Sequence, residues 1–267
     1  MTAPAMRFRK PLVCSKQNNK MELTEKHAEL VGLHYGDGSL IQRKGTNKLR
    51  FQLRGDAITD KAHYDEFIIP LCNELIGFPL FERKLSTVLD ENRNSFGVSI
   101  ESPKIAKFFK SLGIKVGKKT KLKIPAWILQ NEYFSNAFVR GLFDTDGCIY
   151  YGTNHTSKSN LHIIGQCIIA CVSEILMKEV SKILNGLEIK HRFKKRKNNK
   201  KNEQDYFVIE VRRPHHKRFM KIIGSHNPKH LSKFQIAQKF GFCPPRTTPQ
   251  QRANILKGYL DPFSLYL

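Results

Sequence analysis

The sequence predicts an α+β fold made of two pseudo-symmetric halves, each with the element order αββαββα, packed together through two central helices. Three observations predict this fold. A nine-residue motif occurs twice, at residues 30–38 and 139–147. Residues of the same type recur at nearly constant offsets around the two copies. Strand-like and helix-like patterns follow each copy in the same order.

The offsets indicate an internal duplication. The motif aspartates, Asp37 and Asp146, are 109 residues apart, as are Gly77 and Gly186. Four further pairs are each 111 residues apart: Phe96 and Phe207, Pro103 and Pro214, Phe108 and Phe219, and Gly113 and Gly224. Matching Gly, Pro and Phe positions over this length predict two halves related by a pseudo-twofold axis.

In the first half, helical spacing of apolar residues predicts a helix over 23–36. Alternation predicts strands at 39–44 and 49–54 around a turn at 45–47, and a second helix follows at 60–76. Two strands, 80–88 and 95–101, flank a polar turn at 90–94. Pro103 suits the first turn of a helix that runs to residue 112.

The second half repeats this order. A helix that begins near Pro125 leads into the second motif, and strands are predicted at 148–151 and 161–168. A helix at 172–184, strands at 188–195 and 206–213, and a helix at 214–223 complete it. We therefore divide the chain into a basic arm (1–20), a first subdomain (21–112), a basic linker (113–130), a second subdomain (131–235) and a tail (236–267).

Each motif reads as a helix that carries a stripe of small residues. Gly32 and Gly36 are four residues apart, as are Gly141 and Thr145, so both stripes allow another backbone to approach closely. The glycines that end the motifs, Gly38 and Gly147, suit the positive φ of a helix C-terminus. Packing the two stripes together forms the predicted helix interface.

The same packing brings Asp37 and Asp146 side by side at one end of the helix pair. Two carboxylates at helix C-termini repel each other and gain nothing from the helix dipoles, so a bound cation is expected between them. The alternative is that each Asp-Gly forms only a tight turn into the next strand. Their equivalence under the duplication favours metal binding.

The two motifs resemble the paired signature of the LAGLIDADG homing endonucleases, in the single-chain form with two copies. The resemblance covers roughly residues 22–235. Residues 141–147, Gly-Leu-Phe-Asp-Thr-Asp-Gly, are close to the family pattern. The first copy departs from it, because Tyr35 stands where the second copy has the earlier acid, Asp144. The metal-binding acid of the pattern falls on Asp37 and Asp146.

The resemblance implies hydrolysis of both strands of a long, asymmetric DNA site across the minor groove. Carboxylate pairs favour Mg²⁺ first and Mn²⁺ second, and we expect Ca²⁺ to support binding without cleavage. Gly36 and Thr145, which precede the acids, are further candidate ligands. The family also places a basic or amide residue beside each metal. Lys119 or Lys121 and Lys229 match that position best, with Arg54 and Gln166 as second candidates.

The net charge of +23 at pH 7 also predicts a polyanionic partner, and nucleic acid fits better than a membrane because no long apolar span is present. Alternating polar residues on the strands would line one face of each sheet and contact a duplex. For the strand at 80–88, the sequence does not decide which set of alternate residues faces outward. The predicted DNA-binding residues are Gln42, Lys44, Lys48, Arg50, Gln52, Arg54, Arg83, Lys84, Lys121, Tyr150, Gln166, Lys190, Arg192, Lys194, Arg196 and Arg212.

The leading hypothesis is a monomeric, metal-dependent, site-specific DNA endonuclease. One alternative is a protein of the same fold that only binds, either an RNA maturase that assists intron splicing or a DNA-binding regulator. A second alternative is a basic structural protein of the ribosome, although such a protein requires neither the duplication nor the paired acids. The six cysteines form no CxxC pair and no secretory signal opens the chain, so we expect an intracellular protein.

Overall fold

The structure is a computed structural model that describes residues 22–42, 45, 49–76, 86–114, 116–117, 119, 121–155, 161–198 and 204–266. The predicted basic arm (1–20) lies outside these residues, as do four predicted DNA-binding residues: Lys44, Lys48, Arg83 and Lys84.

The first half forms a four-stranded antiparallel sheet of order β1-β2-β4-β3, with helices packed on one face. Side chains alternate along β2: Leu49, Phe51 and Leu53 are buried, and the residues between them are half-exposed. Its elements are α1 (Glu25–Asp37), β1 (Gly38–Gln42), β2 (Leu49–Asp56), α2 (Lys61–His63), a π-helical turn (Tyr64–Ile68), α3 (Ile69–Ile76), β3 (Ser86–Asp90), a 3-10 turn (Glu91–Arg93), β4 (Ser95–Ser102) and α4 (Pro103–Ser111).

The second half repeats this topology in a sheet of order β5-β6-β8-β7. Asn131 caps its first long helix, because its side-chain oxygen accepts the backbone N–H groups of Tyr133 and Phe134. The elements are α5 (Ala126–Leu129), α6 (Glu132–Asp146), β5 (Gly147–His155), β6 (Leu161–Cys171), α7 (Glu174–Gly186), β7 (Arg192–Arg196), β8 (Tyr206–Arg212) and α8 (His215–Ile222). The predicted α+β fold of two related halves is confirmed.

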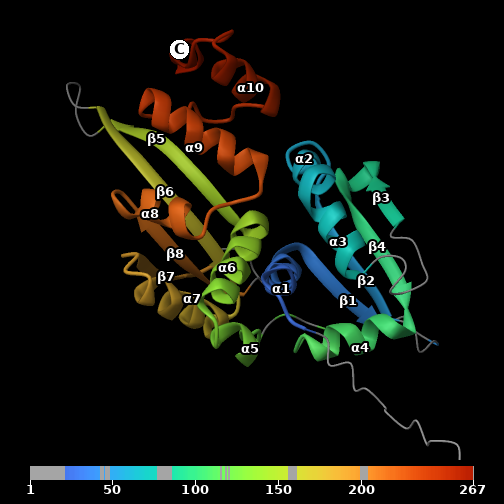
Figure 1. The fold of residues 1–267 in the computed structure, drawn as a ribbon. Helices are drawn as coiled ribbons and strands as arrows, with labels where there is room; N and C mark the ends of the chain where they lie inside the picture. Colours follow the sequence, from blue (N-terminus) through green and yellow to red (C-terminus); the bar gives the residue numbers. More distant parts are fainter. Residues whose placement is uncertain are drawn as a thin grey trace, which may run out of the picture.

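Helices α1 and α6 lie side by side at the centre, with one sheet on either side (Figure 1). The two helices approach closely because glycine faces backbone at their crossing. A Cβ atom added to Gly32 would lie 2.2 Å from the carbonyl oxygen of Phe138, and one added to Gly141 would lie 2.4 Å from that of Glu29. These separations are shorter than any normal van der Waals contact, so a side chain at either position would force the helices apart.

Gly38 and Gly147 differ from the prediction, because neither has a positive φ. Both residues are extended, with φ of −81° and −95°. The chain passes straight from helix into strand, and the glycine lies against the last helical turn. An added Cβ at Gly38 would lie 2.6 Å from the Cα of His34, and at Gly147 it would lie 2.3 Å from the carbonyl oxygen of Phe143. The motif therefore needs glycine here for space.

Two strand predictions are also wrong. Strand β7 begins at Arg192, because Glu188 has a positive φ of 54° and the N–H of Ile189 bonds to the carbonyl of Leu184, so these residues close α7. Lys190 is therefore exposed but outside the strand. Gln42 pairs with buried Leu49, which puts it on the opposite face from Arg50. The exposed residue of β1 on the predicted polar face is Ile41.

Two further helices, α9 (Pro228–Phe240) and α10 (Pro249–Lys257), follow the repeated halves, and a 3-10 turn (Pro262–Tyr266) ends the described chain. α9 packs on β5 and reaches α2 of the first half, while α10 packs on α9. The predicted boundary at residue 235 falls inside α9. Asn227 caps this helix, Pro228 occupies its first turn and Gly241 ends it with a positive φ of 86°.

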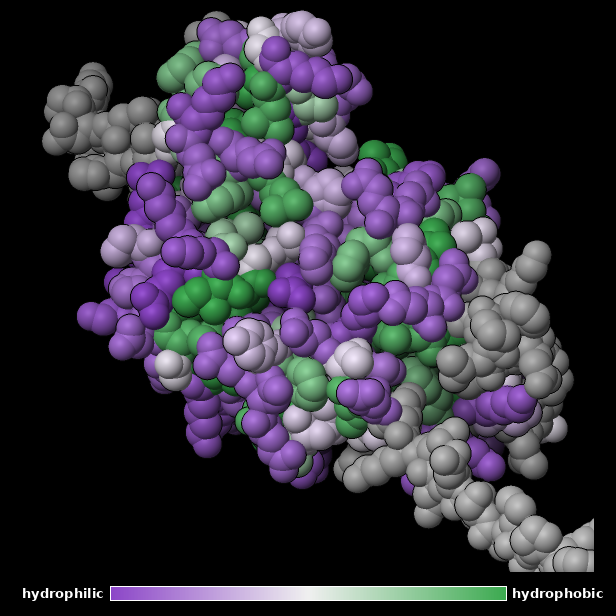
Figure 2. Space-filling model, viewed as in Figure 1, coloured by the Kyte–Doolittle hydropathy of each residue, from purple (hydrophilic) through white to green (hydrophobic). Residues whose placement is uncertain are grey.

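The surface is mainly hydrophilic on the face shown in Figure 2, where hydrophobic residues form small separate patches. Among the described residues, no helix combines the length and the apolar character needed to cross a membrane.

Candidate functional site

Asp37 and Asp146 end the two central helices, on the seam between the halves. The helix ends are close: a Cβ added to Gly36 would lie 2.0 Å from the hydroxyl oxygen of Thr145 and 3.3 Å from the carboxyl carbon of Asp146. Asp146 faces a cleft of about 290 Å³ that Tyr35, Gly36 and Lys119 also line.

Both carboxylates have raised pKa values. Burial, and then the negative charges of Asp146 and Asp60, raise the pKa of Asp37 to about 7. Burial raises the pKa of Asp146 to about 6, and the charge of Lys119 opposes this rise. Asp146 is itself open to solvent at the cleft, so protein surrounds this carboxylate without covering it. Burial is therefore the main reason why both carboxyl groups hold their protons more tightly than usual.

Lys119 lies at the C-terminal end of α1. Its ammonium group donates to the carbonyl oxygens of His34 at 2.7 Å and Gly36 at 2.6 Å, and to that of Tyr35 at 3.3 Å. A cation at this position satisfies carbonyl groups that a helix end leaves unpaired. Burial lowers the pKa of Lys119, and the charges of Asp146 and Asp37 oppose this effect.

Lys229, in the second half, lies near the other side of Asp37 but makes different contacts. It comes from the first turn of α9, and its ammonium group lies 3.1 Å from Asp60 Oδ1. Its positive charge lowers the pKa of Asp37. The alternative candidate Lys121 is exposed and lines a neighbouring pocket with Gly113 and Pro125. Asp60, which precedes α2, was not among the predicted site residues.

The donor atoms at this end of the helix pair suit a hard divalent cation. Asp37 and Asp146 offer carboxylate oxygens, the ligand atoms that Mg²⁺ or Mn²⁺ prefers. Atoms of the other two predicted ligands also have protein partners. The carbonyl of Gly36 accepts Lys119, and the hydroxyl of Thr145 donates to the carbonyl of Gly141 at 3.0 Å.

The raised pKa of Asp37 predicts a pH-dependent gain in stability when this charge is removed. The folded protein binds a proton at Asp37 more tightly than the unfolded chain does, so this residue costs stability as the pH rises from about 4 to about 7. Without divalent metal, Asp37→Asn should raise the free energy of unfolding by about 2 kcal/mol at pH 8 and by nothing at pH 4. Thermal unfolding of both proteins in EDTA, from pH 4 to pH 8, measures this difference in stability.

Asp205 provides the control for this prediction. It is paired with Lys195 at 3.0 Å, and the hydrogen bond from Lys195 lowers its pKa. Asp205→Asn should therefore give no gain at pH 8. A gain from Asp37→Asn that is equally large at pH 4 would contradict the assignment.

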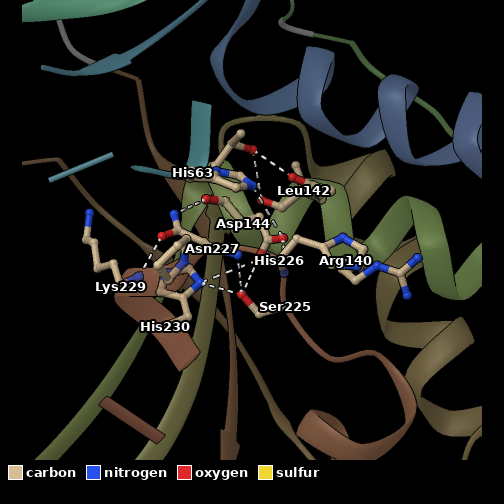
Figure 3. A network of polar contacts seen from close by, with 12 residues as sticks. His63, Arg140, Leu142, Asp144, Ser225, His226, Asn227, Lys229 and His230 are labelled. Carbon is tan, nitrogen blue, oxygen red and sulfur yellow. Dashed lines mark hydrogen bonds and ion pairs between the residues drawn. The ribbon is translucent and has the colours of Figure 1, made fainter. Parts of the chain in front are cut away.

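Asp144 lies at the centre of a buried polar network beneath the seam (Figure 3). Ser225 Oγ donates to its Oδ1 atom, and the backbone N–H of His226 donates to Oδ2 at 2.7 Å. Burial acts to raise its pKa, but the hydrogen bond and charge of His230 and the charge of His63 hold the pKa of Asp144 below its ordinary value.

The network connects this acid to the candidate site. The side chain of Asn227 donates to the carbonyl of Asp144 and also caps α9, the helix that carries Lys229. Sequence patterning could not find this arrangement, because the partners of Asp144 lie about 80 residues away. In the first half Tyr35 takes the place of Asp144, and its hydroxyl donates to the carbonyl of Lys123 at 2.9 Å.

The solvent face of the second sheet carries a row of basic residues around one acid. Lys194 and Arg212 contact Glu210 at 3.0 and 2.9 Å, and Arg196 contacts it at 3.3 Å. Although burial acts to raise it, these cations hold the pKa of Glu210 below its ordinary value. Cross-strand pairing places Tyr150, Gln166 and Arg212 on the same face, and Arg192 stands opposite Glu210. Sequence reasoning missed Glu210.

The corresponding face of the first sheet carries Arg50, Gln52 and Arg54 on β2. Arg50 pairs with Glu101 at 3.2 Å, Gln52 donates to the hydroxyl of Ser99 at 3.4 Å, and Arg54 lies 3.8 Å from Asp90. Both sheets therefore present polar and basic side chains on the face opposite their packed helices.

The comparisons with known proteins agree with this geometry. Residues 134–224 match the LAGLIDADG-like domain family. Among the solved structures, 83 chains match. I-LtrWI, a LAGLIDADG homing endonuclease bound to target DNA, aligns with a TM-score of 0.55 and 11% identity, covering 80% of this chain and 89% of that one. The chain has the LAGLIDADG homing endonuclease fold.

Two other structures with the LAGLIDADG fold match over both halves. I-DmoI in complex with DNA and Mn aligns with a TM-score of 0.53 and 18% identity, covering 75% of this chain and 96% of that one. The meganuclease I-SmaMI bound to uncleavable DNA aligns with a TM-score of 0.51 and 11% identity, covering 87% and 96%. None of the curated proteins compared by sequence matches the chain. The predicted resemblance is confirmed.

Proposed function

We propose that the protein is a site-specific DNA endonuclease that cuts both strands of a long, asymmetric target with the help of a divalent metal. One observation carries the proposal. Two equivalent acids end the paired central helices, and lysines lie close to them: the charges of Lys119 and Lys229 act on Asp37, and that of Lys119 acts on Asp146. The solved structures of this fold that contain DNA, with Mn in one case, support it.

In this proposal the two sheets bind the duplex, and the helix ends lie over the bonds that are cut. Arg192, Lys194, Arg196 and Arg212 contact phosphates, and Gln52, Tyr150 and Gln166 face base edges. Asp37 and Asp146 would hold the metal, which when bound would supply charge stabilisation and activate water for phosphodiester hydrolysis. Lys119 and Lys229 balance the charge of the cleaved phosphates. Since one chain supplies both helices, the protein acts as a monomer on intracellular DNA.

A selection experiment tests the proposal. The protein is incubated with a library of randomised duplexes and Mg²⁺, and the ends that form are sequenced. One enriched cut site with short 3′ extensions supports the nuclease. Binding of duplex DNA without cleavage in Mg²⁺ or Mn²⁺ would indicate a DNA-binding regulator, and preference for a structured intron RNA would indicate a maturase. Either result overturns the proposal.

The basic row on the second sheet should set the salt dependence of DNA binding. Replacing Arg192 and Arg196 with alanine removes two phosphate contacts, so the slope of log affinity against log salt should become less negative by about 2. Lys178 on α7, exposed and paired with Glu174, provides the control, and Lys178→Ala should leave the slope unchanged. Fluorescence anisotropy at several salt concentrations measures both. Equal slopes in all three proteins would exclude this face as the DNA surface.

A further inference from the structure

A cluster of possible metal ligands lies inside the seam, apart from the ends of the central helices. Carboxylate oxygens of Glu29 and Asp144 and a ring nitrogen of His226 all lie within 4.8 Å of one another. Glu29 comes from α1, Asp144 from α6, and His226 from the segment between α8 and α9. Both acids are buried, whereas the side chain of His226 is 41% exposed and leaves a path from solvent.

His63 on α2 supplies an independent observation. Its side chain is only 2% exposed, and its Nε2 atom has no hydrogen-bond partner. This atom lies 3.8 Å from Asp144 Oδ2, and Figure 3 shows the ring directed toward that carboxylate. A separation of 3.8 Å is too long for a hydrogen bond. It is longer than the roughly 3.3 Å between two ligand atoms of a tetrahedral zinc-type ion, so a small movement of the ring would let both atoms share one ion.

We propose that Glu29, Asp144 and His226 bind a transition metal of the zinc type, in a site separate from Asp37 and Asp146. His63, which lies beside Asp144 but outside this group of three, would complete the set by moving toward the ion. Two imidazoles and two carboxylates form a nitrogen and oxygen set that suits Zn²⁺, Co²⁺ or Ni²⁺ better than Mg²⁺. Four protein ligands would leave no open position, which is typical of a structural ion. Such an ion would tie both central helices to α2 and to the segment that leads to Lys229.

The surroundings of the cluster already orient its ligands. Arg140 holds Glu29 through two hydrogen bonds, Nε to Oε1 at 3.0 Å and Nη2 to Oε2 at 2.8 Å. Ser225 and the backbone N–H of His226 hold Asp144. Hydrogen-bonded ligand carboxylates of this kind are usual around protein metal sites. His226 Nδ1 now lies 2.7 Å from Glu29 Oε1, so metal binding would release any proton shared there.

Zinc and cobalt binding to the full chain tests the site. Every protein carries Asp37→Asn and Asp146→Asn, so that metal at the helix ends cannot contribute. Isothermal titration with Zn²⁺ should give one ion per chain, and Co²⁺ should produce the visible absorption bands of a four-coordinate site. His63→Gln and His226→Gln should each weaken Zn²⁺ binding at least 100-fold and remove the cobalt bands.

His216→Gln is the matched control. His216 is also buried and its Nδ1 atom also lacks a hydrogen-bond partner, but its ring packs against Tyr151 and Phe234 instead of Asp144. This variant should keep zinc affinity within a few-fold of its parent. If His63→Gln does not fold, the zinc affinity of His226→Gln still tests the site, because His226 is exposed and its replacement should not prevent folding. Absence of stoichiometric zinc, or full affinity in His226→Gln, would overturn the site without bearing on DNA cleavage.

Discussion

Double-strand cleavage should disappear when Asp37 and Asp146 are both replaced with asparagine, while DNA binding in Ca²⁺ should persist. Asparagine keeps the size of the side chain but removes the charge that binds a divalent cation. Loss of the metal removes several kcal/mol of transition-state stabilisation, so we expect the cleavage rate to fall by about 1,000-fold or more. Cleavage of the selected target and filter binding in Ca²⁺ measure the two properties.

Two further variants make this result specific. Asp65→Asn removes a carboxylate that is exposed and pairs with Lys61 away from the helix ends, so it should cut at the normal rate. Each single variant, Asp37→Asn or Asp146→Asn, should also lose double-strand cleavage, because each half supplies one of the two acids. A double variant that still cuts would show that other residues hold the metal.

The duplication made much of the fold predictable. Matching positions such as Pro103 and Pro214 fixed the order of elements, and Gly113 and Gly224 do have equivalent positive φ values, 82° and 74°. Local strand register was harder to predict. The pairing of Gln42 with Leu49 puts Gln42 on the face of the buried residues, and a pattern of alternating residues does not fix that register.

The candidate site was predictable only where residues are repeated. Asp37 and Asp146 stand out because they occupy equivalent positions, and Lys119 and Lys229 because they follow equivalent helices. Asp60, Asp144 and Glu210 interact with residues from other elements, and these contacts arise only on folding. Helix α9 was missed although Asn227, Pro228 and Gly241 are ordinary helix-end signals, because the repeat itself ends before it.

The largest effect on stability should come from Gly32→Ala at the crossing of α1 and α6. The new Cβ atom would lie 2.2 Å from the carbonyl oxygen of Phe138 and 2.9 Å from the backbone nitrogen of Leu142. Both are backbone atoms, so no side chain can rotate away and the helices must separate. We expect a loss of about 3 kcal/mol or more in the free energy of unfolding, measured by urea denaturation.

Gly186→Ala in α7 is the matched control, because nothing lies within 4 Å of its added Cβ atom and its φ is not positive. It should be neutral or stabilising by up to about 1 kcal/mol. Equal stability of Gly32→Ala and Gly186→Ala would mean that the central helices tolerate wider spacing. In that case the glycine contact would not fix the distance between Asp37 and Asp146, and other contacts would have to hold the two acids in place for cleavage. A stability loss in Gly32→Ala but not in Gly186→Ala would instead show that the close crossing of α1 and α6 at Gly32 sets the positions of both acids.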